Sequence, residues 1–203
     1  MLLRARMRDS WRSMDKLYFI VNPISGSGRG RRDFARVEAL LRERDGGAGK
    51  AALAELRRGV GHVPGELPKL WGQFLMDLPE EMLSPTGEPS REEWAVYAAL
   101  TLWAMHQQGK EGSMHCKGVS LGEAAGGLLE SQDDMERVWR RLNVVAQAED
   151  MPALAYHLRS LVQLLKASDI AMDYAGLSQD LYDFQRPETV NQVRLRWGQK
   201  FFH

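Results

Sequence analysis

The chain has 203 residues, in which 27 Lys and Arg side chains balance 27 Asp and Glu side chains. A chain of this length buries roughly 70% of its unfolded surface, which is enough for one sizeable core or two small ones. The neutral net charge excludes a generally basic protein, so any nucleic-acid site has to be a local patch. The longest uncharged run, 94–109, is shorter than the ~20 residues of a membrane helix and contains polar side chains, so we expect no membrane span.

The charge is spread unevenly along the chain. Residues 1–32 hold eight Lys and Arg against two Asp and Glu, a net charge of +6, whereas residues 33–203 have a net charge of −6. We therefore predict a basic, flexible N-terminal extension over 1–32 that is not part of the folded core. The single cysteine, Cys116, fits a reducing compartment, and we expect the protein in the cytoplasm.

From residue 33 onward, apolar residues recur at helical spacing. The predicted helices are 33–45, 50–58, 70–78, 91–108, 121–129, 133–147, 152–166, 173–184 and 187–202. Ser90 with Glu93, and Ser120 with Glu123, are capping-box patterns that mark two helix starts. No region favours a sheet, so the predicted fold class is all-α.

The segment 152–166 shows the clearest division into two faces. Its leucines make one apolar stripe, and a second row at i, i+4 and i+7 is polar and basic. The stripe consists of Leu154, Leu158, Leu161 and Leu165, and the polar row of Arg159, Gln163 and Lys166. Spacing alone favours a core-facing stripe with a solvated back over a row that contacts a ligand.

Sequence motifs for catalysis or metal binding are missing. His106, His115 and Cys116 lie near one another in sequence, but no fourth zinc ligand stands at a recognisable spacing. We find no paired-carboxylate signature and no nucleophile motif. The sequence therefore predicts a protein that is not an enzyme and has no metal or cofactor.

The basic residues in the helices are more informative. The predicted nucleic-acid contacts among them are Arg57 and Arg58 at one helix end, Arg137, Arg140 and Arg141 on one helix, Arg159 and Lys166 on the next, and Arg194 and Arg196 on the last. Each one, taken singly, is typical of a solvated surface. Arg194 differs because it falls on the apolar stripe between Val190 and Trp197, where a half-buried guanidinium needs a carboxylate of the fold or a phosphate as its partner.

Two stretches resemble known families. LYFIVNPISGSGRG, within residues 17–30, resembles the N-terminal strand and glycine-rich loop of diacylglycerol-kinase-type lipid kinases, although their GGDGT motif is missing from this chain. That resemblance implies a phosphate-cradling loop. The alternatives are a flexible basic tail and an upstream extension outside the folded protein.

The larger resemblance covers residues 51–203. Seven blocks in order resemble the CasB family, the small subunit of the type I-E CRISPR complex Cascade. They are ALAELRRGVGHVPGELPKLW, ALTLWAMHQQ, GVSLGEAAGGLL, WRRLNVVAQAED, HLRSLVQLLK, MDYAGLSQDLYDF and VRLRWGQKFF. The net charge of −6 over residues 33–203 is less basic than expected for a subunit that holds nucleic-acid strands.

This resemblance implies a non-catalytic, all-helical protein of two small helical domains packed together, which we place at 33–118 and 119–203. Two copies would lie head to tail beside the backbone and large subunits, and would contact guide RNA and the target and non-target DNA strands. The basic residues in the matching blocks are Arg57, Arg58, Arg140, Arg141, Arg159, Arg194 and Arg196, with Lys117 beside the third block. Contacts of these residues with phosphates would hold an R-loop during antiviral defence without reading its sequence.

Two hypotheses compete with a nucleic-acid role: a purely structural helical adaptor, and a phosphate-binding protein that uses residues 22–30. A basic stripe would favour the nucleic-acid role, and intramolecular ion pairs would favour the adaptor. Because the predicted helices 133–147 and 152–166 are joined by a short turn, we also expect Arg140, Arg141 and Arg159 to lie close together.

Overall fold

The computed structural model describes residues 47–75, 78 and 80–203. The predicted extension 1–32, the lipid-kinase-like stretch and the helix 33–45 lie outside the described residues. The elements are α3 (Gly47–Arg58), η2 (Pro68–Leu70), α4 (Trp71–Phe74), η3 (Glu80–Met82), α5 (Arg91–Gln107), α6 (Leu121–Gly126), α7 (Gln132–Ala146), α8 (Met151–Ala167), α9 (Tyr174–Phe184) and α10 (Val190–Phe202). Within the described residues there is no strand, only an isolated bridge between His115 and Met172, so the all-α prediction is confirmed.

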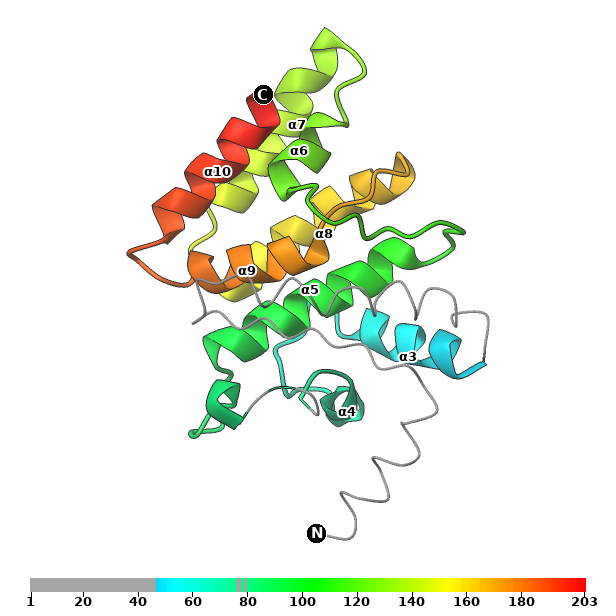
Figure 1. Ribbon diagram of the computed structural model, residues 1–203, viewed down its shortest axis with the longest axis vertical. Helices are drawn as coiled ribbons and strands as arrows, with labels where there is room; N and C mark the ends of the chain where they lie inside the picture. The colour runs from blue at the N-terminus through cyan, green and yellow to red at the C-terminus, as the bar shows by residue number, and fades with distance from the viewer. Residues whose placement is uncertain (1–46, 76–77, 79) are drawn as a thin grey trace, which may run out of the picture.

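Helix α5 crosses the middle of the molecule (Figure 1). Helices α8 and α9 pack on one side of it and α3 and α4 on the other, while α6, α7 and α10 lie toward the far end. Burial from Ala95 to Gln107 explains why the sequence of α5 is apolar all round. Its start is a complete capping box: Ser90 Oγ accepts from the Glu93 amide at 3.0 Å, and Glu93 Oε2 accepts from the Ser90 amide at 2.7 Å.

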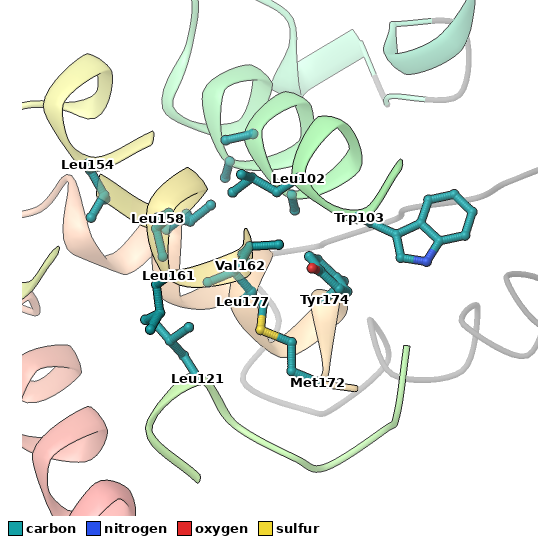
Figure 2. Packing of buried hydrophobic residues seen from close by; sticks show 14 of the residues in the cluster. Leu102, Trp103, Leu121, Leu154, Leu158, Leu161, Val162, Met172, Tyr174 and Leu177 are labelled. Carbon is teal, nitrogen blue, oxygen red and sulfur yellow. The ribbon is translucent and has the colours of Figure 1, made fainter. Parts of the chain in front are cut away.

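Helix α8 buries its leucine stripe completely. Leu154, Leu158, Leu161 and Leu165 are inaccessible to solvent. Figure 2 shows Leu158 and Leu161 on the inner side of α8, between Leu102 of α5 and Leu121 of α6. The predicted core face of this helix is confirmed.

Two tryptophans predicted on apolar faces are largely exposed. Trp71 is 48% exposed, because η2 and α4 together make only two short turns and bury Leu70 and Phe74 instead. Trp139 is 44% exposed, because Val138 fills the core and the next residue lies about 100° further around the helix. Both predictions were therefore wrong. Helix α3 also begins three residues earlier than predicted, inside the glycine-rich stretch.

One continuous hydrophobic cluster contains residues from both predicted domains. Helices α8 and α9 of the second segment pack directly on α5 of the first. A division between residues 118 and 119 stays a prediction.

The crossing of α6 and α10 is unusually close. A Cβ atom at Gly122 would stand 2.1 Å from the carbonyl oxygen of Trp197 and 3.1 Å from Cβ of Lys200. Helix backbones approach this closely only where one of them has no side chain. Gly198 in α10, by contrast, has no atom within 4 Å of the position that a Cβ would take.

We predict that Gly122→Ala lowers the free energy of unfolding by about 1–3 kcal/mol, because the added methyl group overlaps a backbone carbonyl. Gly198→Ala is the matched control and should raise stability by up to about 1 kcal/mol, since alanine is the better helix former. Urea denaturation of both variants measures the difference. Equal stability of the two variants would show that the crossing is not close.

Two buried histidines hold Tyr174 at the base of α9. His106 Nδ1 lies 2.8 Å from the Tyr174 hydroxyl oxygen, and His115 Nδ1 accepts from the Tyr174 amide at 3.2 Å. Burial, together with the smaller effect of the positive charges of Lys110 and Lys166, lowers the pKa of His106 to about 4. His106 is therefore neutral in the folded protein at neutral pH.

The lowered pKa makes stability depend on pH in the acidic range. Between about pH 6.5 and 4 the unfolded chain takes up a proton at His106 that the folded chain does not, so acidification favours unfolding. Between pH 7 and 4.5 we expect the wild type to lose about 2 kcal/mol more than His106→Gln, at ~1.36 kcal/mol per pKa unit. Denaturant titrations at both pH values test this, and parallel losses in the two proteins would contradict it.

Candidate nucleic-acid interface

Helices α7 and α8 form a hairpin with a polar hollow of about 390 Å³ on its outer side. The residues that line this hollow, which we call the arginine pocket, are Glu136, Arg137, Arg140, Arg141, Val144, His157 and Ser160. Three arginines thus converge on one site, and all three were predicted as nucleic-acid contacts.

The local sequence explains the hairpin. Asp150 caps α8 by accepting from the Ala153 amide at 2.8 Å, and Pro152 stands in the first turn, where its missing N–H does no harm. On α7, Val138, Leu142 and Val145 are buried, which turns the arginines outward. Spacings of three and four residues then place the arginines on one side of the helix.

Two arginines of the pocket have acidic neighbours on their own helix. Arg137 donates to Asp134 at 2.6 Å, and Arg140 donates to Glu136. The hydrogen bond from Arg137, followed by that from Ser131, lowers the pKa of Asp134, which also belongs to the cap of α7. Arg141 has no carboxylate partner among the described residues.

Arg159 does not join the pocket. It is exposed on α8, but the residues that α8 contributes to the hollow are His157 and Ser160. Arg159 is therefore absent from the lining that contains Arg140 and Arg141, because a short turn fixes which helices are neighbours but not their rotation. Its closeness to these two arginines stays a prediction. A leucine stripe centred on Leu158 puts Arg159 on the outer side, away from α7.

A second group of cations joins elements far apart in sequence. Lys166 near the end of α8 lies close enough to Lys110 and Arg57 for their positive charges to lower its pKa, after the larger effect of burial. Its Nζ lies 3.4 Å from Gln108 Oε1, and Lys110 pairs with Asp169 at 2.5 Å. Arg57 and Lys166 were predicted as site residues; Lys110 was missed because it stands in a loop.

Arg194 has no carboxylate partner among the described residues. Its Nε donates to the Ala146 carbonyl at 2.6 Å, and its guanidinium carbon stands 5.3 Å from the centre of the Phe184 ring. A backbone carbonyl and an aromatic face take the place of the carboxylate that the fold was expected to supply, and the alternative of an external phosphate stays a prediction. Arg194 therefore ties α10 to the end of α7.

Arg196 takes part in a structural contact. It donates to Asp180 at 2.5 Å, and Trp197 Nε1 donates to the other oxygen of the same carboxylate at 2.6 Å. Burial raises the pKa of Asp180, and Arg196 opposes that shift. This pair connects α9 to α10.

The two remaining predicted site residues are exposed. Arg58 pairs with Glu55 at 2.9 Å on α3, and Lys117 stands in the loop before α6. The pocket residues that sequence reasoning missed are Glu136, Val144, His157 and Ser160. His157 and Ser160 can be identified only when the side of α8 that faces α7 is known, whereas Glu136 and Val144 lie within four residues of the arginines on α7.

The candidate metal ligands have structural roles. His106 and His115 bond to Tyr174, and the Cys116 amide donates to the Met172 carbonyl at 3.0 Å. In the part of the chain that the structure describes, His, Cys, Asp and Glu side chains form no group of three that could hold a metal ion. No helix among the described residues is long and apolar enough to cross a bilayer.

Comparisons with known proteins agree on one family. The family model for CRISPR-associated protein Cse2 matches residues 52–202. CasB from Thermobifida fusca is 34% identical, with a TM-score of 0.67 over 83% of this chain and 97% of that one. A Cse2-family protein from Thermus thermophilus is 25% identical, with a TM-score of 0.60 over 82% and 94%.

A chain from a CRISPR RNA-guided surveillance complex shares the fold at 21% identity, with a TM-score of 0.63 over 82% of this chain and 88% of that one. No curated protein sequence matches the chain. A match over residues 52–202, supported by a 34% identical relative, establishes the family. The chain belongs to the Cse2 family of CRISPR-associated proteins.

Proposed function

We propose that this chain is the small subunit of a type I-E Cascade complex, and that it contacts nucleic-acid backbones through the arginine pocket. Membership of the Cse2 family makes it a non-catalytic protein, and a protein of the same fold occurs in a CRISPR RNA-guided surveillance complex. The observation that carries the nucleic-acid role is the convergence of Arg137, Arg140 and Arg141 on one exposed hollow.

Guanidinium groups suit phosphate because they offer several donors in a plane and remain charged at all relevant pH values. Arg141 lacks an acidic partner among the described residues, so its charge is available. Arg137 and Arg140 are 47% and 70% exposed, and exposed ion pairs contribute only about 0–1 kcal/mol. A phosphate can replace those carboxylates at little cost.

The partners follow from this role. They are the guide RNA, the target and non-target DNA strands, the backbone and large subunits, and a second copy of this chain head to tail. Backbone contacts position a nucleic acid but carry no base information, so guide pairing supplies the specificity. The proposal places the protein in the cytoplasm, where it would act in antiviral defence.

The structural adaptor is the second candidate, and one observation favours it. Four of the ten predicted site residues are engaged by acids of the same chain: Arg58, Arg137, Arg140 and Arg196. An adaptor would need these cations only to hold its own fold and to meet acidic protein surfaces.

The combined variant Arg137→Ala, Arg140→Ala, Arg141→Ala distinguishes the two. Each lost phosphate contact should reduce the slope of log affinity against log salt by about 0.9 for a duplex or 0.7 for a single strand. We therefore expect a slope about two units shallower and weaker target binding by the assembled complex, measured at several salt concentrations. Discrimination between matched and mismatched targets should remain.

The matched control removes the same charge elsewhere, by Lys69→Ala, Arg91→Ala and Arg186→Ala, none of which lines the pocket. Size-exclusion chromatography must first show that both complexes assemble fully. If the pocket variant keeps wild-type affinity and slope in an intact complex, the adaptor is the better description. Equal losses of affinity and slope in both triple variants would show that the change in net charge, and not the pocket, weakens target binding.

A further inference from the structure

Tyr156 is the most exposed of the large hydrophobic side chains that the structure describes, at 68%. It stands in the middle of α8, on the helix whose leucines are completely buried. Neither its hydroxyl nor its ring is needed by the core. A large aromatic group held out in water on a well-packed helix is available to contact another molecule.

The position of Tyr156 relates it to the arginine pocket. His157, which lines the pocket, contacts the Tyr156 ring edge to face, with the ring centres 5.4 Å apart. Ser160, also in the lining, follows Tyr156 by one turn, and Arg159 follows by three residues on the other side. Since residues three and four apart are neighbours on a helix, Tyr156 lies between the pocket and Arg159.

Cations therefore flank the aromatic ring on both sides. On one side are the three arginines of the pocket, and on the other is Arg159, which has no acidic partner among the described residues. Proteins that hold single strands combine a positively charged track for the backbone with aromatic side chains on which bases stack. A duplex has its base faces already stacked and offers phosphates only.

Resting on the nucleic-acid role proposed above, we infer that the α7–α8 face binds single-stranded nucleic acid, with Tyr156 as a platform on which an unpaired base stacks. Phosphates on one side of that base contact the arginine pocket, and the backbone beyond it passes Arg159. His157 supports the ring from the pocket side through the edge-to-face contact. This arrangement gives Arg159 a role although it lies outside the pocket.

The test measures binding of the full-length chain to three labelled 20-mers: oligo-dT, an abasic strand of the same length, and a duplex. We expect Tyr156→Ala to weaken oligo-dT binding roughly fivefold to a hundredfold, the range for loss of one base–aromatic stack. Affinity for the abasic strand and the duplex should stay within about twofold of wild type. Tyr156→Phe keeps the ring and should retain wild-type affinity.

Phe202→Ala is the control for loss of an exposed aromatic group elsewhere, since Phe202 is 58% exposed in the groove between α7 and α10. It should bind all three ligands as the wild type does. As a second readout, oligo-dT that carries 5-iodouracil should crosslink to Tyr156 on irradiation, and mass spectrometry identifies the residue.

The outcomes separate this inference from the function on which it rests. Equal losses of Tyr156→Ala on oligo-dT and abasic strand, or no loss on either, overturn the stacking role. If the triple arginine variant still weakens binding in that case, the backbone-contact function stands alone. If the wild type binds none of the ligands and Tyr156→Ala instead blocks assembly with protein subunits, both proposals fail and Tyr156 belongs to a protein interface.

Discussion

Complete burial of the leucine stripe on α8 is the constraint on which the rest of the structure depends. Four leucines inaccessible to solvent each contribute roughly 1.5–3 kcal/mol relative to an exposed position, which is far more than any surface contact of the same helix. The rotation of α8 about its axis is therefore fixed by the core. This rotation also fixes the direction of every outward residue of α8, including Tyr156, Arg159 and Ser160.

The same constraint extends through the neighbouring helices. Helix α5 is buried all round because α8 and α9 cover one side of it and α3 the other. On α7, three buried residues face inward and three arginines face outward. Hydrophobic packing thus determines the geometry of the arginine pocket. The charged groups lie where the buried residues of the same helix place them.

The sequence predicted well the buried faces of α5 and α8 and the start of α5, although the predicted helix 70–78 consists only of the short turns η2 and α4. The stripe on α8, the capping box at Ser90 and the burial of α5 all follow from spacing within one segment, and the structure confirms them. Predictions failed where two segments meet. Trp139 was expected inward and lies at the groove toward α10, because the rotation of α7 depends on which of two adjacent apolar residues the core accepts.

In the arginine pocket, too, the sequence predicted the residues of one helix but not how two helices meet. Arg137, Arg140 and Arg141 share one helix face, so their convergence follows from the sequence, but the rotation of the partner helix does not. The fixed direction of α8 brought His157 and Ser160 to the pocket in place of Arg159. Arg194 was rightly expected to need a partner, yet a carbonyl of α7 and an aromatic ring of α9 supply it, and neither is visible as a charge in the sequence.

An ion pair within the chain does not by itself exclude its arginine from a nucleic-acid contact. A buried ion pair does, because its arginine cannot leave the carboxylate. Asp180 is 8% exposed and holds both Arg196 and Trp197, and removal of Arg196 would leave a buried carboxylate without its counterion. That arginine is committed to the fold. The acids beside Arg137 and Arg140 lie at the surface, where pairing contributes little and a phosphate competes on equal terms. The nucleic-acid surface that we propose is therefore smaller than the number of basic residues suggests, and it centres on the α7–α8 hairpin.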